Sequence, residues 1–83
     1  MIVRFTADGM RDLGYWEATD VRVVGKIRSL ITSIEASPFT GLGKPEALKG
    51  NLGGWWSRRI TKEHRLIYRV HRRHRNFALP LSL

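Results

Sequence analysis

The clearest pattern along the chain is an apolar stripe between residues 20 and 37. Its members recur at steps of one, three or four positions: Val23, Ile27, Leu30, Ile31 and Ile34. This spacing places them on one face of an α-helix, with polar residues opposite. Asp20 can cap the start of this helix, and Ser37 before Pro38 ends it, because the residue before proline avoids the α region. The pattern therefore predicts a helix that packs its apolar face on another element.

A second and weaker helical pattern precedes this one, over about residues 7–18. Met10, Leu13 and Trp16 recur there at helical spacing, and we expect them to face the core. The β-branched and aromatic residues of Ile2–Phe5 predict a strand before it. A tight turn joins the two helices, so they are expected to form a hairpin over one face of a sheet.

Two strands around a short turn are predicted at residues 55–61 and 64–70. A loop of three residues places Arg59 opposite Arg65, whereas a loop of two residues places it opposite Leu66. We favour the first register because it keeps similar residues together on each face. Two facing arginines repel each other unless an anion or an acidic side chain lies between them, which indicates a functional site.

The remaining segments are a long loop, a polar turn and a last strand. Residues 39–54 hold five of the eight glycines and are predicted to be an ordered loop with no regular structure beyond a turn at 45–49. Residues 71–75 are too polar to bury, and the alternation in residues 76–83 predicts a strand that Pro80 restricts to a sheet edge. The apolar anchors expected for the loop are Phe39, Leu42, Leu48 and Leu52.

Together these elements predict one small α+β domain over residues 1–83. Their order is β-α-α-β-β-β, and the expected architecture is a twisted, mainly antiparallel sheet with the two-helix hairpin on one face. The chain is short enough that its core must be small. The other face of the sheet is left for function.

The composition adds a strongly basic character. Fifteen Lys and Arg against seven Asp and Glu give a formal charge of +8. Such a charge attracts polyanions, and the aromatic residues among the cations after Lys44 favour nucleic acid over a membrane surface. The absence of cysteine excludes disulfides and thiolate metal sites. With no signal peptide, membrane-spanning run, metal-ligand spacing or cofactor motif, we expect a cytoplasmic protein that uses no metal and no cofactor.

One acidic residue lies among several cations in residues 44–65. The candidate catalytic residues are Glu46 and Arg65, and the candidate substrate-binding residues are Lys44, Lys49, Arg58 and Arg59. Cations can hold a phosphate while the carboxylate takes a proton, as metal-independent RNA cleavage by the ribose 2′-hydroxyl requires. Glu46 is then the base, and the arginines grip the phosphate. The alternatives are a surface carboxylate and exposed strand arginines.

Two runs of residues in this region resemble a known family. Residues 38–52 read PFTGLGKPEALKGNL, and residues 56–68 read WSRRITKEHRLIY. They are similar to the YoeB (Txe) toxins of the RelE superfamily, and the likeness extends from Phe5 to Val70. The resemblance implies a microbial-ribonuclease-like α+β fold and a toxin of a bacterial type II toxin–antitoxin system.

The resemblance also implies an activity and its partners. By matching position, Glu46 is the implied general base and Arg65 the implied phosphate and transition-state stabiliser, while Lys49 and Arg59 support them. The implied activity is that of an mRNA interferase, an endoribonuclease that cuts mRNA in the ribosomal A site. The implied partners are mRNA, the ribosome and a YefM-like antitoxin, with operator DNA bound only through the antitoxin. A homodimer is compatible with the resemblance.

The last residues depart from that family. Its members carry a tail similar to Arg-Tyr-His-Tyr, whose histidine is the implied general acid, whereas residues 78–83 read ALPLSL. Loss of a positioned acid removes about a hundred- to ten-thousandfold in rate. We therefore expect impaired cleavage with the fold and antitoxin binding retained, and His64 or His74 is an alternative acid.

Two hypotheses of other classes stay open beside the nuclease. The first is a catalytically inactive toxin homologue that acts only as an antitoxin-binding module. The second is a ParE-like gyrase inhibitor, which would share the fold but does not need the grouping of Glu46, Lys49 and Arg65.

Overall fold

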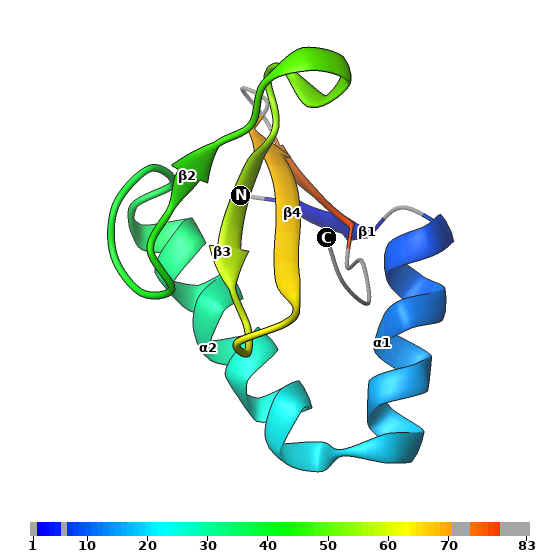
Figure 1. The fold of residues 1–83 in the computed structure, drawn as a ribbon. Coiled ribbons are helices and arrows are strands. Elements are labelled where there is room, and N and C mark those ends of the chain that lie inside the picture. Colours follow the sequence, from blue (N-terminus) through cyan, green and yellow to red (C-terminus); the bar gives the residue numbers. More distant parts are fainter. Residues whose placement is uncertain (1, 6, 71–73, 79–83) are drawn as a thin grey trace.

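The computed structural model describes residues 2–5, 7–70 and 74–78. Within them, two helices cover one face of a five-stranded sheet (Figure 1), which confirms the predicted α+β class. The helices are α1 (Ala7–Thr19) and α2 (Val21–Ala36). The strands are β1 (Ile2–Phe5), β2 (Glu46–Ala47), β3 (Trp56–Arg59), β4 (Arg65–Val70) and β5 (His74–Ala78). A short 3-10 helix, Gly50–Leu52, follows β2. No helix in the described part of the chain is long and apolar enough to cross a membrane.

The sheet has the strand order β1-β5-β4-β3-β2, and its pairs are antiparallel except for β1 with β5. The last strand was predicted at an edge, but β5 lies between β1 and β4 and begins at His74, inside the predicted turn. That prediction was wrong because it relied on Pro80, which cannot donate to a ladder, whereas the described pairing of β5 runs through His74–Ala78 on both sides. Residues 71–73 and 79–83 lie outside the described residues. The two-residue strand β2 was not predicted and forms an edge.

The hairpin of β3 and β4 has the favoured register. Arg59 pairs with Arg65 and Trp56 pairs with Tyr68. The backbone N–H groups of Ile60 and Thr61 both donate to the His64 carbonyl, at 2.9 and 3.2 Å, and close the turn. Because side chains alternate along a strand, this register fixes which residues face the helices and which face outward.

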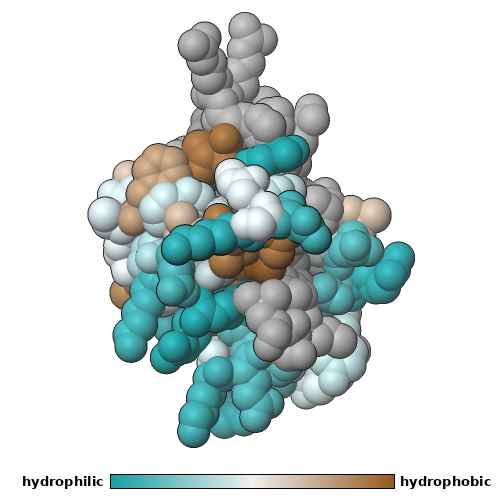
Figure 2. Space-filling model, turned by 45° about the horizontal axis from the view of Figure 1, so that its top comes forward, coloured by the Kyte–Doolittle hydropathy of each residue, from teal (hydrophilic) through white to brown (hydrophobic). Residues whose placement is uncertain are grey.

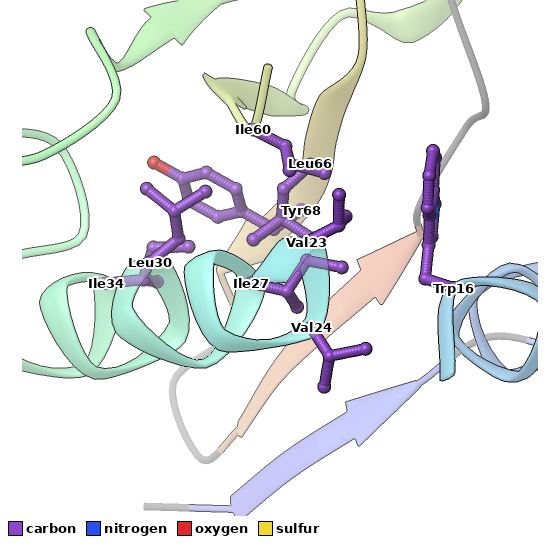
Figure 3. Packing of buried hydrophobic residues seen from close by; sticks show 9 residues of the cluster. All are labelled: Trp16, Val23, Val24, Ile27, Leu30, Ile34, Ile60, Leu66 and Tyr68. Atoms are coloured by element: carbon purple, nitrogen blue, oxygen red, sulfur yellow. The ribbon is translucent and has the colours of Figure 1, made fainter. Parts of the chain in front are cut away.

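The core lies between α2 and the helix-facing side of the sheet (Figure 3). The predicted stripe of α2 is buried except for Ile31, which is partly buried, and Leu30 and Ile34 are completely inaccessible. Its partners on the sheet include Leu66 and Tyr68, and Trp16 closes the side nearest α1. The full set of buried apolar residues in this cluster is Trp16, Val23, Val24, Ile27, Leu30, Ile34, Ile60, Leu66 and Tyr68.

One residue of the predicted α1 stripe does not face the core. Met10 is 57% exposed, whereas Gly9 is buried. The line that faces inward runs through Gly9, Leu13 and Trp16, which also have the i, i+4, i+7 spacing of one helix face. A glycine cannot be recognised as a core position by its hydrophobicity, which is why the sequence indicated Met10 instead.

A buried arginine joins α2, the following loop and the sheet. Arg58 of β3 is 0% exposed and faces the helices. Its Nε donates to the Tyr68 hydroxyl at 3.2 Å, and Nη1 donates to Ser33 Oγ at 2.6 Å. The other three N–H groups reach carbonyl oxygens of the loop: Leu42 at 3.1 Å, Thr40 at 2.7 Å and Ser37 at 2.5 Å. All five guanidinium donors therefore have acceptors.

These bonds explain how the loop after α2 is held. The predicted apolar anchors Phe39, Leu42 and Leu52 are 50%, 52% and 41% exposed, so that prediction was wrong for them, while Leu48 is partly buried. The loop is instead fixed through its carbonyl groups, by Arg58 and by the Tyr68 hydroxyl, which donates to the Pro38 carbonyl at 2.5 Å. A buried guanidinium without acceptors costs free energy, so the buried Arg58 side chain holds these loop carbonyls in place.

Replacing Arg58 by methionine should strongly destabilise the fold. The Arg58→Met variant keeps a long side chain but removes all five hydrogen bonds of the guanidinium, which should lower the free energy of unfolding by about 3 kcal/mol or more. Arg59→Met is the matched control, because Arg59 is exposed and should change it by less than about 0.5 kcal/mol. Urea denaturation of both variants measures the difference, and equal losses would contradict the role given to Arg58.

Asp20 should make the stability of the protein depend on acid. Its side chain caps α2 by accepting from the Arg22 backbone N–H at 3.0 Å, and this bond holds the pKa of the carboxyl below its ordinary value. Because the folded pKa is lowered, the contribution is complete above the ordinary pKa and is lost as the pH falls through the lowered pKa. The melting temperature should therefore fall in acid, and it should fall less for Asp20→Asn than for the unchanged chain. Parallel plots of melting temperature against pH for the two proteins would refute this.

Candidate functional site

The candidate site lies on the face of the sheet turned away from the helices. Alternation along the hairpin places Ser57 and Arg59 of β3 and Arg65 and Ile67 of β4 on this face. Glu46 of β2 pairs with Ser57 and lies beside them. Figure 2 shows that hydrophilic residues gather over much of the visible surface, with a small hydrophobic area among them.

An ion pair between Glu46 and Arg65 forms the centre of this site. Arg65 Nη1 lies 3.1 Å from Glu46 Oε2 and also donates to Ser57 Oγ at 3.1 Å. The Glu46 side chain is 65% exposed and that of Arg65 is 25% exposed, so a ligand can reach both. In the described part of the chain, Nε and Nη2 of Arg65 have no acceptor, and these two donors can grip a phosphate.

The other predicted cations are exposed and lie near this pair in the chain or in the sheet, with one exception. Arg59 is exposed and is the cross-strand neighbour of Arg65. Lys44 and Lys49 are exposed on the segments before and after β2, so they flank Glu46 along the chain. Arg58 is the exception. It faces the helices and all its donors are used within the fold, so the structure contradicts its prediction as a substrate-binding residue.

Glycines in the loop allow the approach to Glu46. Gly41 and Gly43 have φ of +113° and +80°, a region that favours glycine. A Cβ on Gly43 would lie 3.0 Å from the backbone oxygen of Arg59, and the Arg59 N–H donates to the Gly43 carbonyl at 2.6 Å. This contact ties the loop to β3 three residues before Glu46, and Lys44 continues the left-handed conformation with φ of 53°.

The sequence did not reveal two other features of this face. Ser57 is fully buried and holds Arg65, and Arg69 stacks on Trp55 with its Cζ 4.7 Å from the ring centroid. Both could have been found from the sequence, because in the favoured register residues 55, 57 and 69 point to the same side of the hairpin as Arg59 and Arg65. His64 lies elsewhere, edge-on to Trp16 with ring centroids 4.9 Å apart, so it is not beside Glu46. Within residues 7–70 no cluster of three or more His, Cys, Asp or Glu could hold a metal ion.

Comparison with known proteins identifies the family to which this chain belongs. The family model for the YoeB-like toxin of bacterial type II toxin–antitoxin systems matches residues 5–79. The chain is 59% identical to toxin YoeB of Escherichia coli K12 over 59 residues, which cover 71% of this chain and 70% of that protein. It is 48% identical over 69 residues to toxin YoeB of Streptomyces coelicolor, covering 83% and 82%.

Solved structures agree with these relatives. The YoeB–YefM complex from Staphylococcus aureus superposes with a TM-score of 0.91 at 36% identity, over 100% of this chain and 98% of that chain. The protein is therefore a toxin of a bacterial type II toxin–antitoxin system. Within that class, the chain belongs to the YoeB-like toxin family, as its sequence predicted.

Adding a methyl group at Gly43 should damage both the loop and the site. Gly43→Ala meets a positive φ, the Arg59 carbonyl and the Leu30 side chain, and we expect a loss of about 1–3 kcal/mol in unfolding free energy. Gly25→Ala in α2 is the control, because a Cβ there meets nothing within 4 Å and should stabilise the helix by about 0.5–1 kcal/mol. Chemical denaturation tests both, and a neutral Gly43→Ala would contradict the close approach.

Proposed function

We propose that this toxin is a metal-independent endoribonuclease that cleaves mRNA in the A site of the ribosome. The observation that carries the proposal is the exposed Glu46 carboxylate held 3.1 Å from Arg65, with Arg59 as the cross-strand neighbour of Arg65. A carboxylate that accepts a proton, next to guanidinium donors that stabilise a phosphate, is the minimum required for attack by a ribose 2′-hydroxyl.

The reaction follows from these positions. Glu46 takes the proton of the 2′-hydroxyl, and the resulting oxygen attacks the adjacent phosphorus. The unused donors of Arg65, with Arg59 beside it, stabilise the negative charge that grows on the phosphate oxygens. The bond to the 5′-oxygen then breaks and leaves a 2′,3′-cyclic phosphate, while the departing oxygen needs a proton. Lys44 and Lys49 supply positive charge along the RNA backbone.

The proposed partners follow from the family and from relatives of this chain. Staphylococcus aureus YoeB is known as a complex with YefM and as a dimer; the dimer superposes on this chain with a TM-score of 0.89 at 40% identity. We extend both to this toxin: a YefM-like antitoxin covers it, and two copies can associate. Its substrate is mRNA on the ribosome, so it acts in the cytoplasm, and operator DNA is reached only through the antitoxin.

A second function is favoured by the sequence after β5. Residues 79–83 read LPLSL and offer no group that donates a proton readily at neutral pH. If no other group protonates the leaving oxygen, the toxin cleaves slowly or not at all and acts by binding its antitoxin. The same experiment separates the two functions.

Cleavage of a programmed mRNA on ribosomes should depend on Glu46. Glu46→Gln keeps the shape but removes the base, so the rate should fall by about a hundred- to ten-thousandfold. Glu63→Gln, at the exposed hairpin turn, is the control and should cleave within twofold of the unchanged chain. Equal, measurable rates for the two variants would refute the role of Glu46.

A version carrying the family's Arg-Tyr-His-Tyr tail completes the experiment. Cleavage only by this version assigns the natural chain a binding function. If neither the natural chain nor this version cleaves, the nuclease proposal fails.

A further inference from the structure

We propose that Trp55 and Arg69 form a subsite that stacks one nucleobase of single-stranded RNA beside the phosphate-binding residues. The inference rests on the proposed function in one respect, namely that the substrate is RNA. It assigns a recognition role to two residues that the proposed cleavage chemistry does not use.

The two side chains form one stack on the face that carries Glu46. Arg69 lies four residues after Arg65 on β4, so both point to the same side of the sheet. Trp55 lies two residues before Ser57, and the Arg69 Cζ is 4.7 Å from the Trp55 ring centroid. Both side chains are half-buried, so part of the stack is open to solvent.

The spacing suits a nucleotide next to the bound phosphate. Arg65 Nη1 reaches Ser57 Oγ, so its guanidinium lies at the level of Ser57 along β3. Trp55 is two residues before Ser57, or about 7 Å away from it along the strand direction at the usual rise of a strand. That distance is comparable to the reach of one nucleotide in an extended single strand, so a base adjoining the held phosphate can arrive at the stack.

The stack has no other evident purpose in the fold. Trp55 is not part of the buried cluster between helices and sheet, whereas its neighbour Trp56 packs against that cluster. In the described residues Arg69 pairs with no carboxylate, and its Nε is buried without an acceptor. Aromatic rings and guanidinium planes both stack on nucleobases, with little dependence on sequence because every base has a π-face.

A binding experiment with an RNA that cannot be cleaved tests the subsite. The probe is a tetranucleotide with a 2′-O-methyl group on every ribose, compared with matched probes that lack one base each. Trp55→Ala should weaken binding of the intact probe by about 5- to 150-fold, the equivalent of about 1–3 kcal/mol, and Trp55→Phe by less. Arg69→Ala should weaken it to an intermediate extent. Tyr15→Ala, at an exposed aromatic residue of α1, is the control and should bind within twofold of the unchanged chain.

The abasic probes identify what Trp55 contacts. At one position, removal of the base should weaken binding to the unchanged chain, and Trp55→Ala should then cause no further loss. The inference is overturned if the unchanged chain binds intact and abasic probes equally, if Trp55→Ala behaves as Tyr15→Ala does, or if the intact probe is not bound. The probe cannot react, so the binding experiment is independent of cleavage. Base-dependent binding would support the subsite even if the chain failed to cleave mRNA, and that failure would count against the proposed nuclease activity alone.

Discussion

The Arg58 guanidinium is the contact on which the rest of this structure depends. A charged group is stable in a protein interior only if its hydrogen-bonding groups are all satisfied, and Arg58 meets this condition with five donors and five acceptors. Those acceptors come from α2, from the loop after it and from β4. One side chain therefore fixes the loop that leads to Glu46 against the sheet that carries Arg65.

Because side chains alternate along a β-strand, one residue of β3 can belong to the core while the next belongs to the candidate site. Arg58 and Arg59 are consecutive, yet one is completely buried beneath the helices and the other is exposed beside Arg65. The same alternation divides Trp55 from Trp56, since the first stacks with Arg69 and the second packs with Phe39 at a ring separation of 4.8 Å. A shift of one residue in the register would exchange these roles, so the hairpin turn at residues 60–64 also decides the composition of the site.

Much of the fold could be predicted from the sequence because it depends on local patterns. The stripe of α2, its Asp20 cap and the register of the hairpin follow from periodicity and turn length. The central place of β5 could not be predicted, because parallel pairing with β1 is a long-range contact that leaves no local signal. Arg58 was assigned to the substrate because arginine is usually exposed, and only the arrangement of carbonyls around it shows otherwise.

Two neighbouring arginines concentrate positive charge on the sheet face turned away from the helices. Arg59 and Arg65 lie on this face, and in the described residues Glu46 is the one carboxylate paired with either of them. Arg59 and Arg65 are direct cross-strand neighbours, an arrangement that is unfavourable for like charges. A phosphate between them would turn this repulsion into two attractions, without moving a backbone already fixed through Arg58. The fold thus keeps the two cations together at a cost that a phosphate, if bound there, would offset.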